Sequence, residues 1–129
     1  MITQATQDWI DFAEENYRVA LRENRHIKYP AHNTVCFNAQ QCVEKYLKAY
    51  LVQHQISFPF KHELGTLCQL CATQEPAFHL LSPIAVNLNR YAVEARYPGL
   101  QTTKQDALDA IKDMKDCRQF IRARLGLSK

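Results

Sequence analysis

The chain has 129 residues, enough to bury one hydrophobic core and too few for two domains of ordinary size, so we expect a single domain over residues 1–129. Hydrophobic residues make up 47% of the chain and charged residues 22%, a composition that excludes intrinsic disorder. The net charge of +3 is too small to indicate nucleic-acid binding by itself. Three glycines and five prolines are too few turn residues for an all-β fold, so helices are favoured.

A first helix is predicted from Thr3 to about Arg25, and the Tyr29-Pro30 step ends it because proline disfavours helical geometry in its predecessor. Its apolar residues recur at helical spacing: Trp9, Phe12, Ala13, Val19 and Ala20. A second helix is predicted from about Ala31 to His54. Its apolar stripe consists of Val35, Ala39, Cys42, Val43, Tyr46, Leu47 and Tyr50. Its opposite side is polar, and we expect that side to face solvent: Gln40, Gln41, Glu44, Lys45 and Lys48.

Three shorter patterns follow Pro59, which interrupts the periodicity. A short helix is predicted from His62 to about Cys71, and Ser82-Pro83 predicts a capped helix that ends near Tyr97, before Pro98-Gly99. The final helix is predicted to open at Thr103, with Asp106 in its first turn, and to end at a cap on Gly126. No segment has the alternating pattern of a strand, so the sequence predicts an all-α fold.

The cysteines and histidines do not indicate a redox or metal centre. Cys68 and Cys71 share the predicted apolar face of their helix with Leu64 and Leu67, so we interpret them as buried structural thiols. No two of the five histidines have helical metal-ligand spacing with a carboxylate partner. We therefore expect no metal and no cofactor. The N-terminus lacks the pattern of a signal peptide, and no apolar run is long enough to span a bilayer, so we expect a cytoplasmic protein without membrane contact.

The segment YAVEARYPG, residues 91–99, places Arg96 and Tyr97 at the expected end of a helix. A guanidinium there offers a planar fork for a phosphate, next to an aromatic ring on which a base could stack. The alternative is that Arg96 hydrogen-bonds the last carbonyls of the helix or a carboxylate, while Tyr97 only packs.

Three segments together resemble the HEPN domain, which is named for higher eukaryotic and prokaryotic nucleotide-binding proteins. They are FNAQQCVEKYLKAYL (residues 37–51), KHELGTL (61–67) and YAVEARYPG (91–99), in matching order and spacing. The resemblance implies an up-and-down bundle of four main helices plus a short connecting helix. It also implies a homodimer that works with a minimal nucleotidyltransferase in a two-component, toxin-antitoxin-like module.

Some members of the resembled family cleave RNA with an arginine followed, after four to six residues, by a histidine. Here Arg25 and His32 have that spacing, but they lie in the first interhelical turn rather than in the later helix where the motif is expected. About one such match is expected by chance. Arg96 is followed by no histidine. The resemblance therefore leaves enzymatic activity open, with Arg25, His32 and His62 as the candidate catalytic residues.

Our leading hypothesis is a protein that binds a nucleotide or RNA in a polar cleft. The cleft would be lined by Lys45 and Lys48 from the second helix and by Arg96 and Tyr97 from the later one, with His62 at its rim. Arg96 would bind phosphate, Lys48 would add positive charge and Tyr97 would stack on the base. The alternatives are an active, metal-independent endoribonuclease toxin and a scaffold that binds no ligand but regulates a nucleotidyltransferase.

Overall fold

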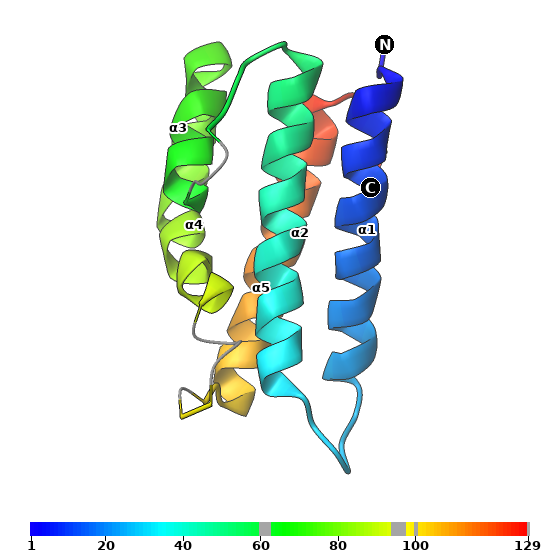
Figure 1. Ribbon diagram of the computed structural model, residues 1–129, viewed down its shortest axis with the longest axis vertical. Coiled ribbons are helices and arrows are strands. Elements are labelled where there is room, and N and C mark those ends of the chain that lie inside the picture. The colour runs from blue at the N-terminus through cyan, green and yellow to red at the C-terminus, as the bar shows by residue number, and fades with distance from the viewer. Residues whose placement is uncertain (60–62, 94–97, 100, 129) are drawn as a thin grey trace.

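The computed structural model describes residues 1–59, 63–93, 98–99 and 101–128, and within them the chain is an all-α bundle of five α-helices and two short 3₁₀ helices (Figure 1). The helix α1 (Gln4–Asn24) runs down the bundle in the view of Figure 1, and α2 (His32–Gln53) returns beside it. After α3 (Leu64–Gln74), the 3₁₀ helix η1 (Pro76–Leu81) leads into α4 (Ser82–Asn89). The 3₁₀ helix η2 (Arg90–Ala92) then precedes α5 (Lys104–Arg124). The predicted fold class, an up-and-down bundle with a short connecting helix, is confirmed.

The helix α2 is the centre of the bundle, since α1, α3, α4, η2 and α5 all contact it. The stripe predicted from its periodicity is confirmed as core. All seven of its side chains are buried, together with Cys36, Ala49 and Leu51. Burial of Leu67 and Leu88 from the helices packed around α2, and of Met114 from α5, completes a continuous apolar core. Burial of this apolar area is the main favourable contribution to folding.

Helices α1 and α5, which the chain enters from an extended residue, are each capped by a threonine side chain. Thr3 caps α1 by accepting a hydrogen bond from the Thr6 N–H. Thr103 and Asp106 form a reciprocal capping box at the start of α5, which confirms the predicted opening of that helix. Gly126, with φ of 77°, follows the end of α5, as its sequence position predicts.

The prediction of an N-cap at Ser82 is wrong. The chain is already helical through η1, so Leu81 precedes α4 in helical geometry and no side chain caps the helix. The regular α-helix also ends at Asn89, and η2 continues it only to Ala92. The predicted end near Tyr97 lies outside the described residues, as does the predicted start of the short helix at His62.

The predicted division into apolar and solvated faces is wrong in both of the first two helices. Phe12 is 57% exposed, whereas Thr6, Ile10 and Ala13 are the buried residues of the first half of α1. Gln40, predicted on the solvated side of α2, is 1% exposed, and its side-chain oxygen accepts a hydrogen bond of 2.7 Å from Gln41. Because α2 is surrounded by other helices, little of its surface is left for solvent.

One polar cluster ties together three helices that lie far apart in sequence. Glu14 of α1 accepts two hydrogen bonds from the Arg118 guanidinium of α5, at 2.7 and 2.8 Å, and one of 2.6 Å from the Tyr46 hydroxyl of α2. Arg122 donates to the Tyr46 hydroxyl at 3.0 Å. Burial alone raises the pKa of Glu14, but these hydrogen bonds and the two arginine charges outweigh it and leave that pKa below its ordinary value.

Candidate functional site

Lys48, one of the four residues predicted to bind a nucleotide, lies on the side of α2 that faces α1. Its ammonium is 3.2 Å from Glu44 Oε2, one helical turn away. The same nitrogen lies 5.1 Å from the centre of the Trp9 ring and 5.6 Å from that of Phe58. The Lys48 side chain is only 12% exposed. A carboxylate and two aromatic faces already stabilise this charge.

Lys45 lies nearly one turn before Lys48 and is also engaged. Its ammonium donates a hydrogen bond of 2.6 Å to Asn16 Oδ1 and lies 5.1 Å from the centre of the Phe12 ring. Burial lowers the pKa of Lys45. The structure thus brings the two predicted lysines together on one aromatic face, which we call the lysine face: Lys45, Lys48, Trp9, Phe12 and Phe58. A phosphate that bound here would have to displace existing partners.

The surface beside the lysine face is acidic. A depression of about 430 Å³ is lined by Asp8, Asp11, Phe12 and Glu15 of α1. Carboxylates repel a phosphate and attract cations. The described part of this surface is therefore less suited to an anion than the sequence pattern of α2 indicated.

Arg96 and Tyr97, the other two predicted nucleotide-binding residues, and His62, the predicted rim residue, lie outside the described residues. The segment that follows them is held at the start of α2, because Asn33 Oδ1 accepts hydrogen bonds of 3.0 and 2.6 Å from the Thr102 N–H and hydroxyl. Lys45 lies roughly 18 Å further along α2 than Asn33, at about 1.5 Å per helical residue. A common cleft for all four residues stays a prediction.

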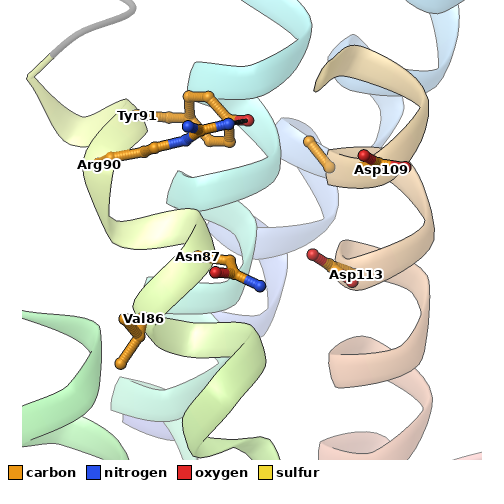
Figure 2. A pocket seen from close by; sticks show the side chains of 7 residues that line it. Val86, Asn87, Arg90, Tyr91, Asp109 and Asp113 are labelled. Atoms are coloured by element: carbon orange, nitrogen blue, oxygen red, sulfur yellow. Dashed lines mark hydrogen bonds between the residues drawn. The ribbon is translucent and has the colours of Figure 1, made fainter. Parts of the chain in front are cut away.

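A pocket of about 310 Å³ opens between α4 and the first half of α5 (Figure 2). In Figure 2, Arg90 and Tyr91 extend from η2, directly after α4, while Asp109 and Asp113 come from the facing helix α5. The Arg90 guanidinium donates to the Tyr91 hydroxyl at 2.6 Å and to Asp106 Oδ1 at 3.1 Å. Burial raises the pKa of Asp113. With its arginine already paired and two more carboxylates in its wall, this pocket is a poor site for a phosphate.

A third pocket, of about 240 Å³, lies where α1 ends, α2 begins and α5 begins. We call it the basic pocket, and its lining residues are Asn24, His26, Ile27, Pro30, His32, Lys104 and Leu108. Three of these side chains carry or can gain positive charge, and each comes from a different part of the chain. No pattern in the sequence groups these positions, because the interhelical turn and the start of α5 are more than seventy residues apart.

Arg25 and His32, the candidate catalytic pair, lie at the two ends of the α1–α2 turn. Arg25 is the C-terminal cap of α1, and its backbone N–H bonds the carbonyl of Arg22. His32 is the first residue of α2 and lines the basic pocket. Among the described residues, no hydrogen bond joins the two side chains or orients the His32 ring. The predicted acid/base role of His32 stays a prediction.

The described residues hold no group of three or more His, Cys, Asp or Glu side chains placed to bind a metal ion. All five cysteines are buried and unpaired, and burial raises the pKa of the Cys68 thiol to about 11. The interpretation of Cys68 and Cys71 as buried thiols is confirmed. Nor does any described helix combine the length and the apolar character required to cross a membrane.

The chain is an all-α bundle with α2 at its centre. This is the kind of fold that the three sequence motifs indicated. The HEPN domain family matches residues 6–124, so this chain belongs to the HEPN domain family. Its fold is similar to the crystal structure of TT1696 from Thermus thermophilus, with a TM-score of 0.75, 22% sequence identity, and coverage of 94% of this chain and 98% of that one. At that identity the likeness shows the fold alone. Comparison with curated proteins gives no significant match.

Proposed function

We propose that this protein is a nucleotide- or RNA-interacting HEPN protein. The observation that carries the proposal is the family match, which spans nearly all of the chain from α1 to the end of α5. The lysine and two histidines that line the basic pocket, at the α1–α2 turn and the start of α5, are consistent with a phosphate-bearing ligand. Without the family match, the basic residues alone would be interpreted as an ordinary solvated charged face.

The binding residues proposed from the sequence are Lys45, Lys48, Arg96 and Tyr97. In this proposal Arg96 binds phosphate through its planar fork, and Tyr97 stacks on the base. Lys48 contributes positive charge. Because its ammonium lies 3.2 Å from the Glu44 carboxylate, the ligand must compete with Glu44 for it. The proposal thus requires a ligand with enough negative charge to win that exchange.

Isothermal titration calorimetry with nucleotides and a short single-stranded RNA tests the binding function. Arg96→Ala is expected to abolish binding and to leave the helical circular dichroism signal unchanged. Unchanged binding by this variant means that the assignment of Arg96 is wrong. A wild-type protein that binds neither ligand class contradicts the function itself.

The protein is further proposed to act as a homodimer in the cytoplasm, together with a minimal nucleotidyltransferase in a toxin-antitoxin-like module. This part rests on the family resemblance. Sedimentation of the purified protein tests the dimer, and a single monomeric species contradicts it. Co-expression with an adjacent nucleotidyltransferase gene product, followed by co-purification, tests the partner. If calorimetry shows no nucleotide or RNA binding but a nucleotidyltransferase co-purifies, the scaffold function replaces the binding function.

A metal-independent endoribonuclease is the second candidate function. It is favoured by one observation, that His32 lines a basic pocket at the same turn as Arg25. A histidine there could exchange protons with a ribose hydroxyl while the arginine contacts the phosphate. Incubation of the purified protein with RNA in a chelator, beside His32→Ala, tests it. Intact RNA in the wild-type reaction excludes the activity for that substrate.

A further inference from the structure

The groups of the basic pocket that carry or can gain positive charge, Lys104, His26 and His32, have few carboxylates beside them. Elsewhere a carboxylate neutralises the cation in each of these pairs: Lys48 with Glu44, Arg90 with Asp106, Lys112 with Asp116, Arg118 with Glu14, and Arg124 with Glu75. Within the described ranges, neither His32 nor Lys104 forms an ion pair or a side-chain hydrogen bond. His26 has only Glu23, at 4.0 Å.

Two of these three groups, His32 and Lys104, are the first residues of α2 and α5, and the third, His26, lies in the turn after α1. Lys104 lies within the capping box that Thr103 and Asp106 form, and the His26 N–H donates to the carbonyl of Glu23. Asn33, next to His32, is hydrogen-bonded to Thr102, which links the start of α2 to the segment before Lys104. A lysine and protonated histidines from different segments of the chain can contact one phosphate from several sides.

Apart from Asn24, the rest of the lining of the basic pocket is apolar: Ile27, Pro30 and Leu108. Ile27 is 94% exposed and Leu108 is 45% exposed, and Pro30 is exposed as well. Ligand pockets combine an apolar wall with a few placed polar groups, and the basic pocket has both. A flat nucleobase has the apolar faces that such a wall can cover.

We propose that the basic pocket holds one nucleotide unit, with its phosphate near His26, His32 and Lys104 and its base against Ile27, Pro30 and Leu108. The proposal rests on the nucleotide- or RNA-interacting function but names a site separate from the lysine face. The unit is either a free mononucleotide or one residue of a single-stranded RNA.

A path for a longer strand adjoins the basic pocket. Lys28 and Tyr29 are exposed on the same turn, and the Lys28 ammonium lies 5.6 Å from the centre of the Tyr29 ring. An exposed aromatic ring beside a cation is the arrangement on which successive bases of single strands stack. Lys28 and Tyr29 are not part of the pocket lining, so they can distinguish a strand from a free nucleotide.

Calorimetric titration with adenosine 5′-monophosphate, adenosine and a single-stranded decaribonucleotide tests the proposal. Lys104→Gln and His32→Gln are each expected to weaken binding of the monophosphate about tenfold, since each removes one contact to a charged phosphate. Adenosine, which has no phosphate, is expected to bind at least about tenfold more weakly than the monophosphate. Lys115→Gln is the control, because Lys115 is exposed, unpaired within the described residues and lies three turns further along α5. The Lys115→Gln variant should bind the monophosphate with the same affinity as the wild type.

The outcomes separate the pocket from the proposed function and the two ligand sources from each other. Tighter binding of the decaribonucleotide than of the monophosphate, weakened by Lys28→Gln, supports the pocket and identifies RNA. Equal affinity for the decaribonucleotide and the monophosphate, unchanged by Lys28→Gln, supports the pocket and identifies a free nucleotide. If the wild type binds and both pocket variants, with intact circular dichroism, bind equally well, the pocket proposal is overturned while the function stands. If the wild type binds none of the probes, both fail.

Discussion

Replacing Glu14 by glutamine tests the polar cluster that joins α1, α2 and α5. The substitution keeps the side-chain volume but removes the charge that Arg118 contacts through two hydrogen bonds of 2.7 and 2.8 Å. It leaves two guanidinium groups, which are only 17% and 15% exposed, without their carboxylate. Breaking a fully buried ion pair costs roughly 3 to 5 kcal/mol. Because Glu14 is 22% exposed and solvent relieves part of this penalty, we expect a loss of about 2 kcal/mol.

Urea denaturation followed by circular dichroism measures this loss at neutral pH. A loss of about 2 kcal/mol corresponds to a fall of about 1 M in the urea midpoint for a chain of this size. Glu15→Gln is the matched control, since Glu15 is the neighbouring acid, is exposed and forms no hydrogen bond or ion pair within the described residues. A loss below about 0.5 kcal/mol for Glu14→Gln, or an equal loss for both variants, refutes the role of the cluster.

The stability difference between the wild type and Glu14→Gln should also depend on pH. The pKa of Glu14 in the folded protein lies below its ordinary value of 4.5, so its contribution is fully present above that pH and is lost as the pH falls through the folded pKa. The difference in unfolding free energy between wild type and Glu14→Gln should therefore be constant at neutral pH and shrink in acid. A difference that grows as the pH falls below 4.5 contradicts the sign of the shift.

Three further predictions concern other parts of the fold. Thr103→Ala should cost about 1 kcal/mol in urea denaturation, because it removes the side chain that accepts from the Asp106 N–H. Leu47→Ala, at a fully buried position of α2, should cost about 3 kcal/mol, and a cost below about 1 kcal/mol would mean that the core is not packed as described. Thiol labelling at pH near 8 should be at least about 100-fold slower in the native protein than in denaturant, since Cys68 is buried and its thiol pKa is raised to about 11.

The fold was predictable where a local pattern determines it. The apolar stripe of α2 and the pairing of Thr103 with Asp106 each depend on residues within a few turns of one helix, and both are confirmed. Ser82 was misassigned as a cap because the preceding η1 has no apolar periodicity by which to recognise it. The burial of Gln40 follows from the packing of several helices around α2, which its own sequence does not encode.

The candidate sites were less predictable because they join distant segments. The hydrogen bonds between Glu14 and Arg118 span 104 residues, and a sequence with several possible acid and arginine partners cannot select that pair. His32 and Lys104 likewise meet at one pocket only through the turn of the chain at the end of the bundle. Lys45 and Lys48 share one side of α2, but that side lies against α1 and not in solvent, and their partners Asn16 and Glu44 reduce their capacity to bind another anion.

The most direct test of the central claim is an anisotropy titration of a fluorescently labelled, single-stranded RNA with the wild-type protein at low salt. A nucleotide- or RNA-interacting HEPN protein should give saturable binding that weakens as salt rises, because each phosphate contact releases condensed counterions. Anisotropy that stays constant up to about 100 µM protein, together with no calorimetric response to free nucleotides, would contradict the claim.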